Sequence, residues 1–143
     1  MPFIKAEVKE LKPTEPPPII GGTETILIAE DDADVRKFTK HILEEFGYKV
    51  IEAVDGEDAI NKFLQNKDKV HLLVFDLIMP KKSGKDAYKE IKKLRPDMKA
   101  LFMSGYSKDV LAKEGILEEE LHFILKPISP TKLLRKIREV LGK

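Results

Sequence analysis

From Thr25 onward, the apolar residues fall into five short runs that are separated by longer segments with helical spacing. Several of these runs are apolar at every position, which is typical of strands buried on both faces of a parallel sheet. The five predicted strands are residues 25–29, 49–53, 72–76, 100–104 and 122–125. The regular alternation of strand and helix predicts an α/β protein in which helices cover both faces of one parallel sheet.

The segments between the predicted strands carry apolar residues three or four positions apart, as one buried face of a helix requires. The last helix has the clearest signals, because Ser129 is a favourable N-cap, Pro130 suits the first helical position and Gly142 follows the last apolar residue. A helix near residues 108–114 has only a weak pattern. The apolar faces of the other helices are Val35, Phe38, Ile42, Leu43 and Phe46, then Ala59, Ile60, Phe63 and Leu64, then Ala87, Ile91 and Leu94.

The first 24 residues differ from the rest of the chain because they are rich in proline and glycine, which interrupt helices and central strands. We predict a linker or tail over residues 1–24 and a single doubly wound (βα)5 domain over residues 25–143. A chain of 143 residues is long enough to bury one sizeable core.

The composition excludes several classes of function. A net charge of +1, with 42% apolar and 36% charged residues, gives no basic field that would attract nucleic acid. The absence of cysteine excludes disulfides, thiolate metal sites and cysteine nucleophiles. No apolar run is long enough to span a bilayer, and the N-terminus lacks a signal pattern. We therefore expect a soluble cytoplasmic domain that contacts neither membrane nor nucleic acid.

Chemically reactive residues follow four of the five predicted strands. The acidic pair Glu30 and Asp31 follows the first strand, Asp76 and Ser104 end the third and fourth, and Lys126 follows the fifth. Because the functional crevice of an open parallel sheet lies at the carboxyl ends of its strands, we expect these side chains to meet at one edge.

The clustered carboxylates predict a divalent cation, since without one they would repel each other and bind protons. An all-oxygen site with few protein ligands suits Mg²⁺, with Mn²⁺ as the other choice. The cation, together with Lys126 and the Ser104 hydroxyl, would neutralise an incoming phosphoryl group. Asp76 is then the natural nucleophile, and its attack on phosphorus would form an aspartyl phosphate.

Four segments of this sequence resemble the receiver domains of two-component signalling, the CheY-like response regulators. They are ILIAEDDADVR at residues 26–36, DLIMP at 76–80 with Gly84 four residues on, FMSGY at 102–106 and LKP at 125–127. The resemblance extends from about residue 25 to residue 141. It implies the flavodoxin-like strand order 2-1-3-4-5 for the sheet.

The resemblance also implies a role for each residue of the predicted site. Asp76 would be phosphorylated, and the metal ligands would be Glu30, Asp31, Asp76 and the backbone carbonyl of Ile78. Lys126 would pair with the phosphoryl group, and the Lys126–Pro127 bond would be cis. Ser104 would turn its hydroxyl toward the phosphoryl group and Phe123 would be the switch aromatic.

The resemblance also bears on the lifetime of the phosphorylated state. Ile78 and Tyr106 occupy positions that influence hydrolysis of the aspartyl phosphate, and an apolar Ile78 predicts a long-lived aspartyl phosphate.

The function implied by the resemblance is that of a phosphoacceptor in a phosphorelay. The donor would be a phosphohistidine on a histidine kinase or a histidine phosphotransfer protein. Phosphorylation would change the face formed by the fourth helix, the fifth strand and the fifth helix, which could also form a dimer.

The segment from Gly21 onward and the FMSGY motif are most similar to the C-terminal receiver of hybrid histidine kinases. Such a domain catalyses only its own phosphorylation and dephosphorylation, whereas a hybrid parent would be a histidine kinase. A stand-alone response regulator is the alternative within the family.

Other interpretations of these residues are weaker. An aspartate-nucleophile phosphohydrolase usually has a second acid two residues after the nucleophile, where this chain has Ile78. A flavodoxin-like flavin carrier needs a phosphate-binding loop after the first strand, where Glu30 and Asp31 would repel phosphate. A degenerate receiver that serves only for docking does not require the full set of reactive residues found here. Asp32 and Asp34 are interpreted as capping or first-turn acids of the first helix.

Overall fold

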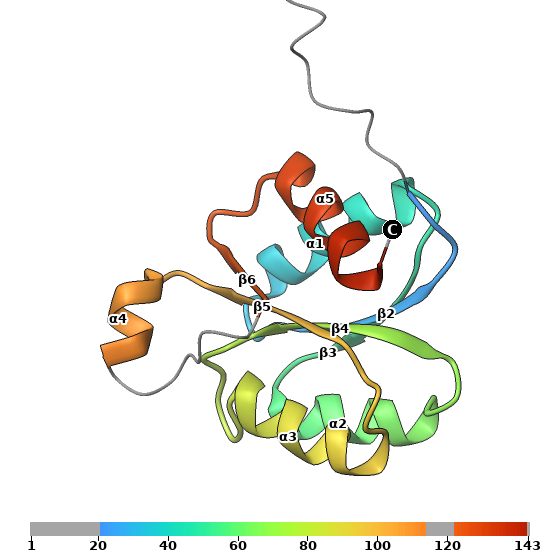
Figure 1. Cartoon of the computed structure of the whole chain (residues 1–143), viewed down its shortest axis with the longest axis horizontal. Helices are drawn as coiled ribbons and strands as arrows, with labels where there is room; N and C mark the ends of the chain where they lie inside the picture. Colours follow the sequence, from blue (N-terminus) through green and yellow to red (C-terminus); the bar gives the residue numbers. More distant parts are fainter. Residues whose placement is uncertain (1–20, 114–121, 143) are drawn as a thin grey trace, which may run out of the picture.

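The computed structural model describes residues 21–113 and 122–142, without the side chains of residues 108 and 112. Ten elements alternate along the chain (Figure 1), and we keep the labels of that figure. The strands are β2 (Thr25–Ala29), β3 (Lys49–Ala53), β4 (Val70–Asp76), β5 (Ala100–Ser104) and β6 (His122–Leu125). The helices are α1 (Ala33–Glu45), α2 (Gly56–Gln65), α3 (Gly84–Leu94), α4 (Lys108–Lys113) and α5 (Pro130–Leu141).

The five strands form one parallel sheet in the order β3-β2-β4-β5-β6. Numbered along the chain, this is the order 2-1-3-4-5, so the predicted fold class and topology are confirmed. Most of the predicted tail, residues 1–20, lies outside the described part of the chain. The described helices include none that is long and apolar enough to cross a membrane.

The third strand starts two residues earlier than predicted. Val70 is fully buried and lies opposite Thr25 in the β2 register, whereas the exposed His71 interrupts the apolar run from which the strand was predicted. The register shifts after this first pair, where the backbone N–H of Thr25 donates to the His71 Nδ1 at 3.0 Å. Strand pairing therefore extends across a polar residue that the pattern alone places in a loop.

Two apolar layers hold the helices on the two faces of the sheet. Figure 1 shows α1 and α5 on one face and α2 and α3 on the other. Alternate residues of each strand point to opposite faces, so that Leu27 packs in the α2 and α3 layer while Ile28 packs in the α1 and α5 layer. Both residues are fully buried. The core thus explains why the strand runs are apolar at every position.

The apolar face of the first helix is narrower than its spacing predicts. Ile42 and Leu43 are buried as expected, but Phe38 is 47% exposed and Phe46 is also exposed. Leu64 of α2 and Leu94 of α3 are exposed in the same way. These residues lie at the edge of the helical stripe, and contact with the sheet covers only its centre.

Local capping positions the helices that start at the carboxyl ends of the strands. Asp32 is the N-cap of α1 and accepts hydrogen bonds from the backbone N–H groups of Asp34 and Val35. The interpretation of these two acids as cap and first-turn residues is therefore confirmed. Ser129 caps α5 before Pro130, and Gly142 ends this helix in the left-handed conformation. The predicted end of α4, at residue 114, lies outside the described residues.

Candidate functional site

The reactive residues of the sequence meet at the carboxyl edge of the sheet. Asp76 and Ser104 are the last residues of β4 and β5, while Glu30 and Lys126 directly follow β2 and β6. Because β2, β4, β5 and β6 are successive neighbours in the parallel sheet, residues that are distant in sequence come together at one place.

Lys126 connects the two buried carboxylates of this edge. Its Nζ lies 2.7 Å from Glu30 Oε1 and 3.0 Å from Asp76 Oδ2, and it donates a hydrogen bond to each. Glu30 is only 1% exposed and Asp76 is also buried, so both acids rely on this cation for much of their charge compensation.

A third carboxylate completes the cluster. Carboxylate oxygens of Glu30, Asp31 and Asp76 all lie within 4.8 Å of one another, close enough for one cation to contact all three. Asp31 is exposed whereas the other two are buried, so the cluster opens to solvent on the Asp31 side. Three carboxylates with one open side are suited to a small oxygen-seeking cation that retains water ligands.

Burial dominates the proton affinity of Glu30. It raises the pKa of this carboxyl from 4.5 to about 7, and the charge of Asp76 adds to the rise, while the hydrogen bond from Lys126 opposes it. Burial works to lower the pKa of Lys126, but the hydrogen bonds to Glu30 and Asp76 outweigh it and leave that pKa above its usual value. The site thus contains excess negative charge, which a further cation would relieve.

The loop after Asp76 is held tightly against the strand end. The Ile78 N–H donates to Asp76 Oδ1 at 3.3 Å, and the Gly84 N–H donates to the carbonyl of Leu77 at 3.0 Å. A Cβ at Gly84 would overlap the carbonyl oxygen of Asp76, so only glycine permits this approach. Ile78 is 45% exposed, and its apolar side chain occupies the position where a phosphohydrolase carries its second acid.

Ser104 lies at the site with its side chain buried. Its Oγ accepts a hydrogen bond of 2.9 Å from the backbone N–H of Tyr106 and, as a hydroxyl, retains a proton to donate. The backbone N–H of Lys126 donates to the Ser104 carbonyl at 2.8 Å, and the Lys126–Pro127 bond is cis. Phe123 of β6 is half-buried and packs against the apolar layer that contains Leu111.

Sequence reasoning did not assign a role to Arg36. This side chain donates to the backbone carbonyl of Glu30 and pairs with Glu52 on the neighbouring strand β3. Its position four residues after the N-cap Asp32 is a weak local signal, since it places a cation on the first turn beside the acidic pair. The partner Glu52 becomes apparent only once β2 and β3 are paired.

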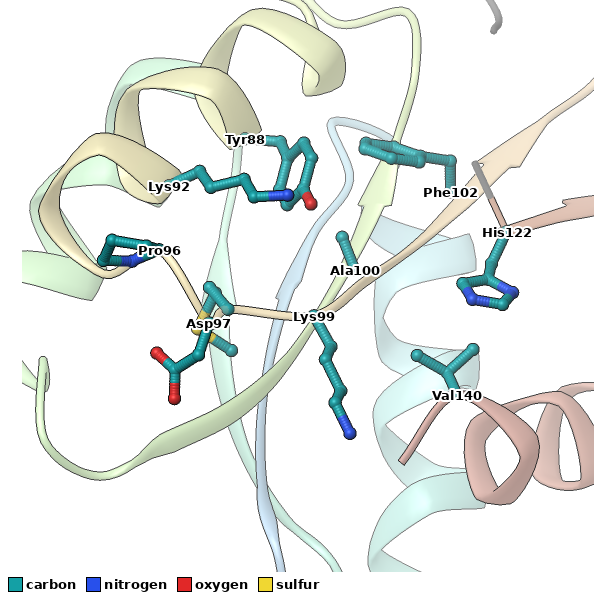
Figure 2. Close-up of a pocket in the computed structure, with 10 residues that line it drawn as sticks. Tyr88, Lys92, Pro96, Asp97, Lys99, Ala100, Phe102, His122 and Val140 are labelled. Carbon is teal, nitrogen blue, oxygen red and sulfur yellow. The ribbon is translucent and has the colours of Figure 1, made fainter. Parts of the chain in front are cut away.

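A separate cavity of about 340 Å³ lies at the other end of β5 (Figure 2). Lys99, directly before this strand, and Ala100, its first residue, line the cavity together with Tyr88 of α3. Figure 2 shows Phe102 and His122 on the β5 and β6 side of this cavity. Because Ser104 ends the same strand, the cavity is distinct from the carboxylate cluster.

Comparison with known proteins agrees with the fold. The family model described as response regulator receiver domain matches residues 26–138. The sensor kinase CckA of Brucella abortus is 32% identical over 142 residues, which is 99% of this chain but only 15% of the length of that kinase.

Two solved structures have the same fold. The receiver domain of the hybrid histidine kinase CckA superposes with a TM-score of 0.70 at 30% identity, covering 82% of this chain and 99% of that one. The response regulator TrrA of Thermotoga maritima, in complex with Mg²⁺ and BeF, gives a TM-score of 0.69 at 27% identity, covering 82% and 98% of the two chains. Since the family model spans most of the sequence and the sheet order agrees, this chain belongs to the response regulator receiver domains of two-component signalling.

Proposed function

We propose that this receiver accepts a phosphoryl group on Asp76 from a phosphohistidine in a reaction that depends on Mg²⁺. The observation that supports this most directly is the position of Asp76, which is buried beside Lys126 and within one cluster of three carboxylates. A carboxylate in this setting has a fixed direction, a neighbouring cation and room for a second one.

The carboxylates fit a divalent cation because they supply hard oxygen ligands and leave one side open to water. Glu30, Asp31 and Asp76 would hold it with the backbone carbonyl of Ile78. When bound, Mg²⁺ would neutralise the charge that develops on the transferring phosphoryl oxygens. The complex of TrrA with Mg²⁺ and BeF supports this choice by similarity. Mn²⁺, with the same preference for oxygen, would replace it.

In the transfer, a carboxylate oxygen of Asp76 forms a bond to phosphorus as the phosphorus–nitrogen bond of the donor breaks. The electron pair of the broken bond stays on the imidazole nitrogen. Lys126 Nζ, already 3.0 Å from Asp76 Oδ2, is within reach of a phosphoryl oxygen on the same carboxylate. The Ser104 hydroxyl can donate to a second oxygen. The protein thus contributes position and charge rather than a further covalent step.

The signal would leave the site through β5 and β6. A phosphoryl group that draws the Ser104 hydroxyl favours one arrangement of the loop after β5, and the half-buried Phe123 on the adjacent strand follows. The face formed by α4, β6 and α5 would change as a result. This face would contact the next partner or a second copy of the chain, and the donor would be a histidine kinase or a histidine phosphotransfer protein.

A hybrid histidine kinase is the proposed parent, with this receiver as a cytoplasmic domain at its C-terminal end. The match to the sensor kinase CckA includes 99% of this chain and so extends into the proline-rich residues before Thr25. A stand-alone response regulator would not need that segment. The parent chain, as a hybrid, would carry the histidine kinase activity that the receiver lacks.

Intact-mass measurement after incubation with acetyl phosphate and Mg²⁺ tests the proposal. We expect the wild type to gain the mass of one phosphoryl group with Mg²⁺ and to gain none when EDTA replaces Mg²⁺. The Asp76→Asn variant should gain none in either case. Asp97→Asn, at an exposed aspartate before β5, is the matched control and should be modified like the wild type. A wild type that takes no phosphoryl group and binds no Mg²⁺ would refute phosphoryl transfer. In that case the chain would be interpreted as a docking domain of the same fold.

A further inference from the structure

Arg36, on the first turn of α1, connects the acidic turn to the neighbouring strand. Its Nη1 donates to the backbone carbonyl of Glu30 at 2.8 Å, and its Nε donates to Glu52 Oε1 at 3.2 Å. The side chain is 13% exposed, so these two bonds are partly shielded from water. The guanidinium therefore joins two partners in a fixed geometry that a lysine cannot reproduce.

The carbonyl that Arg36 holds belongs to the peptide plane between Glu30 and Asp31. Since a peptide unit is planar, fixing its carbonyl direction also fixes the direction in which the chain enters Asp31. The other bonds of Glu30 act elsewhere. Its N–H donates to the Ala53 carbonyl, Oε1 accepts from Lys126 and Oε2 accepts from the Asp32 N–H. Among the hydrogen bonds of the described residues, only the one from Arg36 is accepted by the carbonyl oxygen of this peptide plane.

The anchor of Arg36 is itself held in place. Glu52 lies on β3 opposite Ile28 of β2, and its second oxygen accepts from Lys40 Nζ at 3.0 Å. Burial would raise the pKa of Glu52, but the hydrogen bonds from Lys40 and Arg36 leave that pKa below its usual value. Glu52 is therefore a charged partner at neutral pH, and the register of β2 and β3 sets where Arg36 can reach.

We propose that Arg36 is a positioning residue of the cation site, which directs the Glu30–Asp31 turn so that the exposed Asp31 carboxylate joins those of Glu30 and Asp76. Arg36 does not contact the cation in this arrangement. The inference rests on the proposed function only in requiring that the site bind Mg²⁺. Residues that orient metal ligands in this way commonly change metal affinity by about tenfold or more when they are replaced.

Two substitutions separate the effect of Arg36 on the geometry of the Glu30–Asp31 turn from the effect of its positive charge. Arg36→Met removes both bonds, whereas Lys40→Met removes a cation that pairs with the same Glu52 but does not reach the Glu30 carbonyl. Each variant loses one positive charge near the acidic cluster, and charge alone predicts slightly tighter Mg²⁺ binding in both. A weaker affinity in Arg36→Met only would therefore reflect geometry.

The dissociation constant of Mg²⁺ is measured by calorimetry or by NMR titration of the folded, metal-free protein. We expect it to rise about tenfold in Arg36→Met and to change less than about twofold in Lys40→Met. Arg36→Lys, which retains the charge without the two-way fork, should lie between the wild type and Arg36→Met. In the metal-free proteins, the Asp31 amide resonance should move in Arg36→Met and stay in place in Lys40→Met.

The outcomes that overturn the inference differ from those that overturn the proposed function. An Arg36→Met dissociation constant within twofold of the wild type, or an equal rise in Lys40→Met, would overturn the role of Arg36 while the Mg²⁺ site stands. A wild type that binds no Mg²⁺ would overturn both. Should Arg36→Met fail to fold, Arg36→Lys decides the question, and unchanged affinity together with an unmoved Asp31 amide would refute it.

Discussion

Replacing Glu30 with glutamine should change how the stability of the metal-free protein depends on pH. Glu30 is buried at the carboxyl edge of the sheet, where burial and the charge of Asp76 raise its pKa from 4.5 to about 7. Below pH 4.5 this group is protonated in both the folded and the unfolded protein. Between pH 4.5 and about 7 the folded protein retains a proton that the unfolded chain releases, so Glu30 stabilises the fold less as pH rises through this range.

The size of the effect follows from the shift in pKa. A rise from 4.5 to about 7 corresponds to about 3 kcal/mol of stability lost between acid and alkaline pH. Relaxation of the site and penetration of water reduce this, so about 1–3 kcal/mol is the expected range. The glutamine side chain of the variant cannot ionise and keeps an oxygen that can accept from Lys126. The Glu30→Gln variant should therefore be more stable than the wild type at pH 8 by this amount, with a difference of less than about 1 kcal/mol at pH 5.

Urea denaturation in EDTA at pH 5, 6, 7 and 8 measures the difference directly. Because the other acids titrate in both proteins, the pH dependence of the difference isolates Glu30. Glu44→Gln, at an exposed glutamate of α1, is the matched control and should change stability by less than about 0.5 kcal/mol at every pH. The reasoning is refuted if Glu30→Gln gains no stability over the wild type between pH 5 and pH 8.

Three further substitutions test other parts of the molecule. Gly84→Ala should lower the unfolding free energy by about 1–3 kcal/mol, because the added Cβ overlaps the carbonyl oxygen of Asp76. A Cβ at Gly105 meets nothing within 4 Å, so Gly105→Ala should change stability little. Equal effects of the two substitutions in thermal melts would contradict this. Phe63→Ala should lower the free energy of unfolding in urea titrations by about 3–5 kcal/mol, because Phe63 is fully buried. Phe38 is exposed, so Phe38→Ala should lower it much less, and similar losses would argue against the described core. Ile78→Asn should shorten the lifetime of the aspartyl phosphate, since an amide at this exposed position can orient water; an unchanged or slower decay by mass spectrometry would rule this out.

The order of strands and helices could be predicted from the sequence because their signals are local. Four of the five predicted strands have the observed bounds, and the N-caps at Asp32 and Ser129 lie where the residue types place them. The early start of β4 was missed because Val70 pairs with Thr25 across the exposed His71, and such pairing has no signal in a single apolar run. The exposure of Phe38 was missed because helical spacing shows which residues share a face but not how much of that face the sheet covers.

The sequence by itself determined which residues stand at the ends of the strands, and in a parallel sheet these ends must share one edge. It therefore determined that Glu30, Asp31, Asp76, Ser104 and Lys126 would gather. Only the tertiary structure decided how they meet. Lys126 reaches both Glu30 and Asp76, and Arg36 reaches the Glu30 carbonyl from a helix whose position depends on packing against the sheet. Such contacts depend on register, burial and side-chain reach across neighbouring strands, which no spacing along the chain encodes.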